Sequence, residues 1–373
     1  MQKINLRTLQ GLLPEFYNLR IPLYLWGKPS SGKTSMIRQF ARAKAKELGL
    51  DYSEDEYGPK IFTMKVITLS QFDAPDLRGM PELVGEESLR RTQFVPTKEL
   101  PREGQGIIFF DEMNLADDTV RAACYQYILE GRYSNLLPLR DEKGIDKFWR
   151  VAASNTEQDY SGVNQTALAL LRRFAHYEVQ PEVDEIINYL LEHQKDSRVI
   201  AYLKNFPQDL FPEVWDERLL DKKANPFPYT WELTSTLIEG KTDLSQISNL
   251  AAGCIGNAVA GRFTAFCKNI GKLDIAKFIK APAEEIAKIQ KDTEKASLFY
   301  AVISSLASLW FKKEKKLTAE KVVEIAQIMT KEKIAEFAVA FLKMILRKRT
   351  KELTDVEGFQ QLLTSLGVYF DEV

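Results

Sequence analysis

The segment Leu23–Leu48 constrains the fold more than any other part of the chain. Its first four residues, Leu23–Trp26, are apolar and predict a short buried strand. A turn rich in glycine and small residues follows, and "TSMIRQFARAKAKEL" then has the periodicity of a helix. The turn itself, Gly27–Thr34, fits the pattern G-x-x-x-x-G-K-[ST]. A strand, a glycine-rich turn and a helix in this order predict an α/β unit that binds phosphate.

The residue types in this turn suit a phosphate group. Glycines let the backbone N–H groups face inward, and the helix that starts at the turn offers its positive end. Lys33 adds a charge for the β- and γ-phosphates, and the Thr34 hydroxyl is a ligand for Mg²⁺. The residues predicted to bind a nucleotide are Gly27, Lys28, Pro29, Ser30, Ser31, Gly32, Lys33, Thr34 and Ser35.

A second apolar run, Ile107–Phe110, leads directly into two carboxylates, Asp111 and Glu112. Such a run is typical of a strand buried on both faces, and unpaired carboxylates at its end call for a cation. Open α/β sheets bind ligands at the carboxyl ends of their strands. We therefore predict that Asp111 holds Mg²⁺ through water and that Glu112 polarises the water that attacks the γ-phosphate. The alternative is a helix that simply begins with two acids.

Two further segments have both a structural and a functional interpretation. The apolar run in "FWRVAASNTEQD" predicts a strand that ends at Asn155, an amide that either orients the attacking water or only caps a turn. Arg172 and Arg173 follow a helical pattern that ends at Leu171. They either compensate the helix dipole or supply an arginine finger to the phosphate site of a neighbouring subunit.

Composition excludes several classes of function. The chain has 373 residues, 45% hydrophobic and 28% charged, which suits an ordinary globular protein of two or three domains. Its net charge of −1 gives no overall attraction for nucleic acid or an anionic membrane. With only His176 and His193, a histidine-based metal site is close to excluded, and the cysteines have no metal-binding spacing. The longest apolar stretch, Phe299–Phe311, is too short to span a bilayer, so we expect a soluble cytoplasmic protein.

The motifs "GKPSSGKT", "FFDEMN", "SNTEQDYSGVN" and "ALLRRF", in this order, resemble an AAA+ ATPase of the MoxR type. More loosely they resemble midasin, the cobalt and magnesium chelatase motors and modification-dependent restriction GTPases. Asp76–Gly79 fits an Asp-Leu-x-Gly element of the MoxR family, and the resemblance covers roughly Leu23–Gly261.

This resemblance implies an Mg²⁺-dependent ATPase that works as a hexameric ring on a protein client or with a von Willebrand factor A-domain partner. It places Asn155 at the first sensor and Arg173 at the arginine finger, and Arg172 beside it could share that role. One departure is Tyr229, which stands where relatives commonly have a second-sensor Arg. Residues 80–101 and 132–144 resemble two family insertions that form hairpins, and Arg90, Arg91 and Phe94 are candidates for substrate contact.

The predicted architecture is α/β: a P-loop AAA+ core with a parallel sheet between helices, an α-helical lid and a C-terminal helical extension. The boundaries are 1–180 for the core, 181–282 for the lid and 283–373 for the extension. In the extension, Thr354–Glu357 fits a capping box and predicts the start of the last helix.

Two other functions remain open on the same core. One is a nucleic-acid motor or restriction-type GTPase, against which stand the near-neutral charge and the lack of an N-K-x-D motif for guanine. The other is a nucleotide switch that hydrolyses slowly, an alternative that Tyr229 keeps open.

Overall fold

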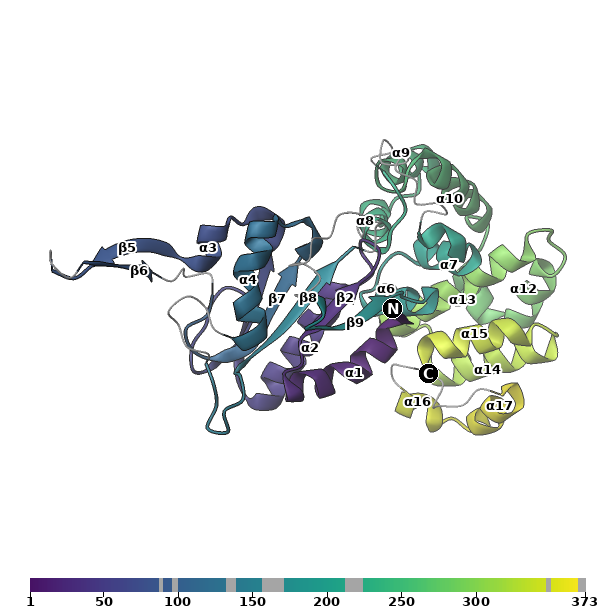
Figure 1. Ribbon diagram of the computed structural model, residues 1–373. Coiled ribbons are helices and arrows are strands. Elements are labelled where there is room, and N and C mark those ends of the chain that lie inside the picture. Colours follow the sequence, from purple (N-terminus) through teal and green to yellow (C-terminus); the bar gives the residue numbers. More distant parts are fainter. Residues whose placement is uncertain are drawn as a thin grey trace. The chain divides into compact units, whose positions relative to one another are not determined.

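The computed structural model describes residues 1–86, 90–95, 100–131, 139–155, 171–211, 224–346 and 350–367. The chain forms two compact units, Met1–Glu182 and Val183–Val373 (Figure 1). The first unit contains the β-sheet and the second is built from helices.

Seven described strands form one parallel sheet in the order β1-β9-β2-β8-β7-β4-β3. Because every strand runs in the same direction, all carboxyl ends lie along one edge. The predicted α/β class with a parallel sheet is confirmed. The strands are β1 (Gln2–Ile4), β2 (Leu23–Trp26), β3 (Asp51–Ser53), β4 (Ile61–Thr68), β7 (Gln105–Asp111), β8 (Phe148–Ser154) and β9 (Ala175–Val179).

Helices cover both faces of this sheet. On one face, α1 (Leu6–Leu19) and α2 (Lys33–Leu48) share an apolar cluster with alternate strand residues such as Leu25. On the other face, α3 (Ala74–Arg78) and α4 (Asp118–Glu130) share a cluster with the intervening residues, including Tyr24. Side chains on both faces of the central strands are therefore buried, which explains why these strands are continuous apolar runs.

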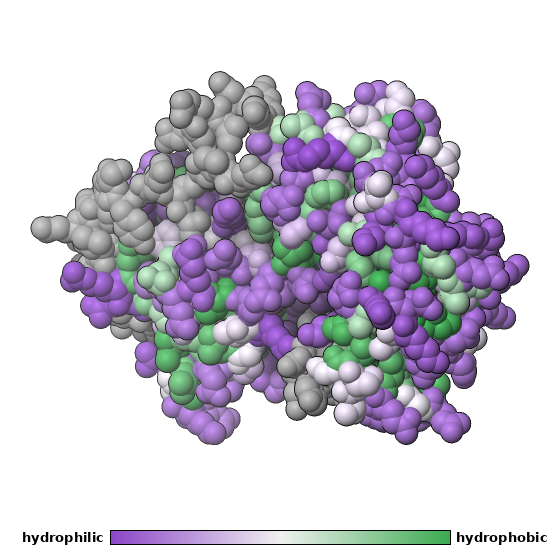
Figure 2. Space-filling model, turned by 90° about the vertical axis from the view of Figure 1, so that its right-hand side faces the viewer, coloured by the Kyte–Doolittle hydropathy of each residue, from purple (hydrophilic) through white to green (hydrophobic). Residues whose placement is uncertain are grey.

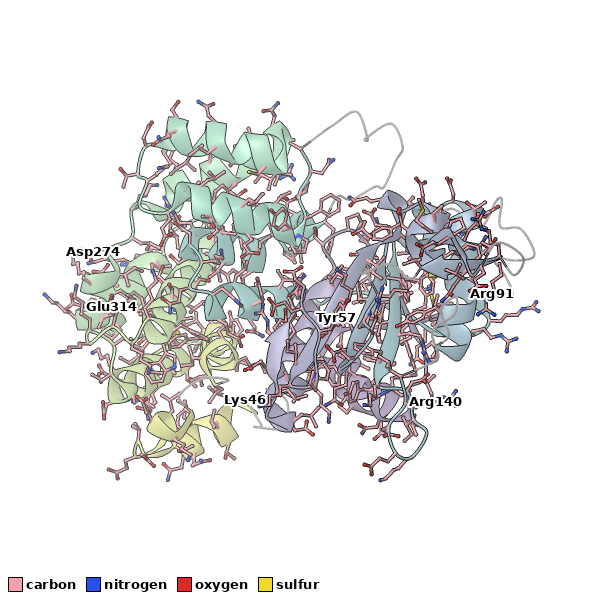
Figure 3. All side chains as sticks on the ribbon, turned by 90° about the vertical axis from the view of Figure 1, so that its left-hand side faces the viewer. Lys46, Tyr57, Arg91, Arg140, Asp274 and Glu314 are labelled. Atoms are coloured by element: carbon pink, nitrogen blue, oxygen red, sulfur yellow. The ribbon has the colours of Figure 1, made fainter. Side chains whose placement is uncertain are left out.

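A hairpin extends from the first unit after α3 (Figure 1). It consists of β5 (Met80–Val84) paired antiparallel with β6 (Arg91–Val95), as the sequence predicts for residues 80–101. In the second predicted hairpin, residues 132–138 lie outside the described part of the chain. Its described remainder includes Arg140, which forms a single antiparallel bridge with Asp146 on the segment before β8 (Figure 3).

The second unit is helical throughout its described residues. Within it, α13 (Lys295–Phe311) packs against both α7 (Ser197–Asn205) and α15 (Ala335–Ile345). The predicted division into a lid and an extension at residue 282 stays a prediction. The helices are α6 (Val183–Glu192), α7 (Ser197–Asn205), α8 (Pro228–Ile238), α9 (Leu244–Ile255), α10 (Asn257–Ile270), α11 (Ile275–Lys280), α12 (Pro282–Ile289), α13 (Lys295–Phe311), α14 (Ala319–Lys331), α15 (Ala335–Ile345), α16 (Thr350–Thr354) and α17 (Phe359–Leu366).

The surface and the helices of the chain show how its apolar residues are distributed. Figure 2 shows hydrophilic residues over much of the visible face, with apolar ones scattered among them. Among the described helices, none combines the length and the apolar character needed to cross a membrane.

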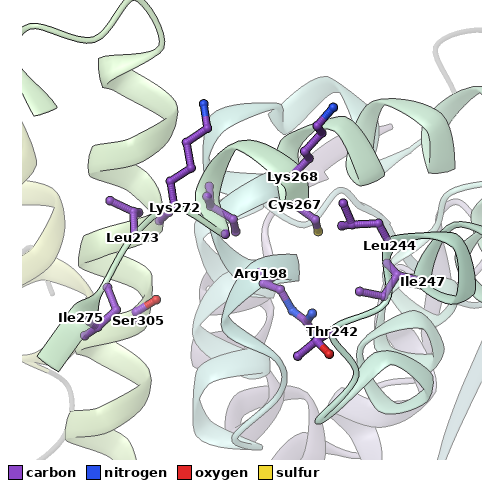
Figure 4. A pocket seen from close by; sticks show the side chains of 13 residues that line it. Arg198, Thr242, Leu244, Ile247, Cys267, Lys268, Lys272, Leu273, Ile275 and Ser305 are labelled. Carbon is purple, nitrogen blue, oxygen red and sulfur yellow. The ribbon is translucent and has the colours of Figure 1, made fainter.

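A cavity of about 490 Å³ lies in the second unit, among α7, α9, α10, α11 and α13 (Figure 4). Arg198, Cys267, Lys268 and Lys272 are among its lining residues, together with several aliphatic side chains. No residue of the predicted nucleotide site lines this cavity.

The last helix begins later than the predicted capping box. Thr354 is the final residue of α16, and its hydroxyl donates to the Lys351 carbonyl. Helix α17 starts at Phe359, behind Gly358 in the left-handed conformation. The prediction from Thr354–Glu357 was wrong because Thr354 ends the preceding helix and Gly358, rather than Thr354, is the N-cap of α17.

Candidate nucleotide site

The glycine-rich turn joins β2 to α2 at the carboxyl edge of the sheet. Gly27 has no room for a side chain, because an added Cβ would lie 2.6 Å from the Val179 carbonyl oxygen. Gly32 occupies the N-cap of α2 with φ of 89°. A glycine has no side chain to cap the helix, so the first N–H groups of α2 remain available to an anion.

Lys33 lies inside this turn and is only 7% exposed. Its ammonium donates to the carbonyl oxygens of Gly27 at 2.9 Å and Lys28 at 3.0 Å. Burial lowers the pKa of Lys33 to about 8, and the nearby Asp111 partly opposes that shift. The turn thus holds a desolvated positive charge, which a phosphate would stabilise better than neutral carbonyl groups do.

Thr34 and Asp111 meet across the sheet edge. The Thr34 hydroxyl lies 3.2 Å from Asp111 Oδ2, and Asp111 Oδ1 accepts from the Glu112 N–H at 3.0 Å. Burial is the main cause that raises the pKa of Asp111 above its ordinary value. A hydroxyl beside a carboxylate is a donor set that suits Mg²⁺, which usually takes one or two carboxylates and completes its shell with water and phosphate.

Within the described residues, no group of three or more His, Cys, Asp or Glu side chains is arranged to hold a metal. A cation at Thr34 and Asp111 therefore depends on oxygen ligands from water and from a bound phosphate.

Glu112 has an unusual backbone conformation. Its φ of 52° lies in the left-handed region, which costs a residue with a Cβ on the order of 1 kcal/mol. Its carboxylate accepts a hydrogen bond from the Ser70 hydroxyl, on the turn after β4. This backbone conformation redirects the chain after Asp111, and the hydrogen bond from Ser70 restrains the Glu112 carboxylate.

Asn155 follows the last residue of β8, and β8 lies between β2 and β7. Its side-chain oxygen is 3.5 Å from Lys33 Nζ. The preceding Ser154 is buried, and its hydroxyl contacts Tyr24 Oη at 2.7 Å and accepts from Asn114 N at 3.1 Å. Ser154 thereby ties the end of β8 to β2 and to the turn after Glu112.

Arg172 and Arg173 lie on an exposed turn before β9. Among the described residues, no carboxylate forms an ion pair with either of them, and no hydrogen bond joins either of them to Thr34 or Asp111. The next residue, Phe174, is buried and packs edge-on against Tyr24 at 5.2 Å between ring centroids. The two charges therefore stand on a turn that is itself firmly attached to the sheet.

The remaining predicted residues are on other elements of the chain. Tyr229 belongs to the second unit, where it is 57% exposed in the first turn of α8. Arg90 precedes β6, and Arg91 and Phe94 lie on it; all three are exposed.

The sequence interpretation missed three residues at the site. Ser70 contacts Glu112, Ser154 supports Asn155, and His176 contacts both Trp26 and the turn before Arg172. Only His176 had a sequence signal, as one of two histidines in the chain.

Comparisons with known proteins identify no close relative. No family model matches the chain, and no curated protein matches it. Solved structures with some similarity include C. elegans PCH-2, with 13% identity over 80% of this chain and 67% of that chain and a TM-score of 0.29. The Aeropyrum pernix ORC2 protein has 11% identity over 92% of this chain and 94% of that chain, with a TM-score of 0.33. Brucella abortus NtrX in complex with ADP has 12% identity over 97% of this chain and 68% of that chain, with a TM-score of 0.37.

These scores are too low to carry an assignment, so any assignment of function depends on the site itself. The carboxyl edge of the sheet brings together a phosphate-type turn, a buried lysine, an Mg²⁺-type donor pair, a restrained glutamate and an asparagine. This arrangement suits the binding of a nucleoside triphosphate and the activation of a water molecule.

Proposed function

We propose that the chain is an AAA+ ATPase that hydrolyses ATP with Mg²⁺. The observation that carries the proposal is the meeting of the glycine-rich turn with the acidic strand, through the 3.2 Å contact between Thr34 and Asp111. Two motifs that are remote in sequence come together with the donor types that a magnesium–nucleotide complex requires.

Each residue of the site has its own role in the proposed hydrolysis of ATP. The turn and Lys33 bind the β- and γ-phosphates, and Thr34 and Asp111 would hold Mg²⁺. When bound, that cation neutralises charge on the phosphate oxygens. Glu112 accepts a proton from the attacking water, whose oxygen forms a bond to the γ-phosphorus while the bond to the β–γ bridging oxygen breaks. Asn155 orients that water, and ADP and phosphate leave.

The arginine pair supports a shared site in a ring, for which we propose six subunits as in MoxR-type proteins. Arg172 and Arg173 are exposed, and no described carboxylate pairs with them. A positive charge supplied by a neighbouring subunit stabilises the charge that spreads over the transferred phosphate. Arg173 is the proposed finger and Arg172 a neighbour able to share its role.

The proposed biological role is to remodel or activate a protein client, directly or through a von Willebrand factor A-domain partner. The exposed hairpin β5–β6 supports this role, since it carries Arg91 and the 40%-exposed Phe94 away from the sheet. Such a projecting element offers both charged and aromatic contacts to a polypeptide.

Nucleotide turnover by the full chain tests the chemical part of this proposal. We expect Mg²⁺-dependent release of phosphate from ATP, and we expect Glu112→Gln to abolish release while ATP still binds. GTP is the matched control. A preference for GTP, or strong stimulation by DNA or RNA, would instead support the alternative of a restriction-type GTPase or nucleic-acid motor.

The biological role has its own test. ATP-loaded Glu112→Gln should retain a specific protein from lysate that the same variant without nucleotide releases. If ATP makes no difference to what is retained, the client-remodelling role is contradicted even when the chain hydrolyses ATP.

A further inference from the structure

His176 on β9 bridges two parts of the first unit. Its Nδ1 accepts a hydrogen bond from the Trp26 indole N–H at 3.0 Å. Its Nε2 lies 2.6 Å from the carbonyl oxygen of Leu171. An indole N–H can only donate and a carbonyl can only accept, so both contacts are satisfied by one form, the neutral imidazole with its proton on Nε2.

The two ends of this bridge have different positions in the site. Trp26 is the last residue of β2 and directly precedes Gly27, the first residue of the glycine-rich turn. Leu171 directly precedes Arg172 and Arg173. The imidazole therefore joins the backbone that leads into the arginine pair to the residue that leads into the phosphate-binding turn.

Strand register and aromatic packing hold the imidazole in place. Tyr24 is the register partner of His176 on the neighbouring parallel strand, so their side chains lie on the same face. The two rings stack with centroids 5.3 Å apart, and Tyr24 also stacks on Trp26 at 4.4 Å. Phe174 contacts His176 edge-on at 6.3 Å. An apolar ring would satisfy neither Trp26 nor Leu171, whereas the imidazole, with one donor and one acceptor, satisfies both.

The same aromatic group reaches the other catalytic elements. The Tyr24 hydroxyl contacts Ser154, which precedes Asn155 and accepts from the Asn114 N–H in the turn after Glu112. The arginine turn is thus connected through side chains to each strand that presents a residue of the proposed active site.

We propose that His176 is a positioning residue that fixes the arginine turn relative to the glycine-rich turn of the same subunit. This inference rests on the proposed shared ATPase site. In a ring, the finger that a subunit presents to its neighbour is then coupled to the nucleotide in its own site. His176 acts through Trp26 and Leu171 and does not touch the substrate.

Mixed rings separate this role from simple support of the fold. Glu112→Gln subunits have an intact finger but an inactive site, and Arg173→Ala subunits have an intact site but no finger. Mixing them should restore ATP hydrolysis above that of either alone, because some interfaces then combine a working site with a working finger. His176→Phe keeps an aromatic side chain and loses both hydrogen bonds. It is then introduced either into the Glu112→Gln subunit, which donates the finger, or into the Arg173→Ala subunit, which donates the site.

We expect a loss of about tenfold or more when His176→Phe is on the finger-donating subunit, since a shift of about 1 Å at a reacting group can cost up to 100-fold. On the site-donating subunit the same change should alter the rate less than about twofold. Trp26→Phe, which keeps the stacking and loses the N–H donor, should show the same asymmetry. His176→Gln should recover part of the rate, because its amide can still donate to Leu171.

The outcomes are distinguishable. An equal loss in both positions, a loss only on the site-donating subunit, or no loss in either would overturn the positioning role. If the parent mixture itself shows no restored activity, the shared site is refuted and this inference with it. The equal loss counts against the positioning role for a variant whose melting temperature matches that of its parent subunit. If His176→Phe fails that check, Trp26→Phe and His176→Gln decide the outcome in its place.

Discussion

The hydroxyl of Thr34 donates to the carboxylate of Asp111 at 3.2 Å, so the first turn of α2 and the end of β7 meet through two side chains of the type that binds Mg²⁺. These residues come from motifs on two strands separated by β8. The contact shows that the parallel sheet, rather than local sequence, assembles the proposed metal site.

Asp111→Asn should weaken the binding of Mg²⁺–ATP by about 10- to 100-fold, because it removes the negative charge that faces the cation. Binding of ATP in the presence of EDTA should change far less. Thr34→Ser, which keeps the hydroxyl, is the matched control and should bind nearly as the parent does. Isothermal titration calorimetry measures all three, and an equal loss with and without Mg²⁺ would contradict the proposed metal site.

The affinity for ATP should fall as the pH rises above about 8. The pKa of Lys33 is lowered to about 8 by burial, so the lysine loses its proton in the free protein above that pH. Phosphate favours the protonated form, and each pH unit above 8 should therefore weaken binding by up to tenfold, with uptake of one proton. Adenosine, which has no phosphate, is the control ligand and should show no such trend. Calorimetry in buffers of different ionisation enthalpy counts the protons.

The same shift predicts an opposite trend in the stability of the free protein. Below pH 8, Lys33 is charged both in the folded and in the unfolded chain, and the folded state bears the cost of burying that charge. Between pH 8 and 10.5 the folded state releases the proton first, so this lysine's contribution to the free energy of unfolding rises, by about 3 kcal/mol in all. Urea unfolding measures the free energy of unfolding at each pH across this range. That free energy should rise with pH in the parent by the stated amount relative to Lys33→Met, which lacks this contribution.

Glu112→Gln should reduce the rate of ATP hydrolysis by about 100-fold or more, since it removes the general base. Ser70→Ala should change the rate by only a few-fold, because Ser70 contacts only Oε2 of Glu112 and the carboxylate keeps other lone pairs with which to engage water. Ser70→Thr keeps that hydroxyl and is the control. Steady-state phosphate release distinguishes these results, and a large loss in Ser70→Ala would show that Ser70 supports the active position of Glu112 instead.

Gly27→Ala should destabilise the protein by about 2 kcal/mol and weaken nucleotide binding, because its Cβ would lie 2.6 Å from the Val179 carbonyl oxygen. Gly11→Ala is the opposite case. Gly11 lies in α1 with no atom within 4 Å of an added Cβ, so alanine should stabilise the helix by up to about 1 kcal/mol. Urea unfolding compares the two variants, and similar losses in both would contradict the close approach at Gly27.

Some parts of the fold could be predicted from the sequence because they depend on local patterns. The runs Leu23–Trp26 and Ile107–Phe110 are apolar at every position, a pattern typical of a strand covered on both faces. Both lie in the sheet as expected. The hairpin of residues 80–101 followed from two short runs with strand character on either side of "GEES".

Other features depend on contacts between distant residues and leave no local pattern. Ser70 meets Glu112, and Trp26 meets His176, only after the strands pair in their final order. The start of α17 was predicted wrongly because Thr354 belongs to the end of α16, and the helix that follows starts only after Gly358. The proposed roles of Arg172 and Arg173 depend on a second subunit and stay predictions.

The most direct test of the shared ATPase site is the rate of ATP hydrolysis per chain, measured over a range of protein concentrations. The rate should climb as subunits assemble, and Arg173→Ala should abolish it while leaving the affinity for ATP nearly unchanged. Arg172→Ala, the matched control, should cause the smaller loss. A rate per chain that is independent of concentration and unaffected by Arg173→Ala would contradict the shared site.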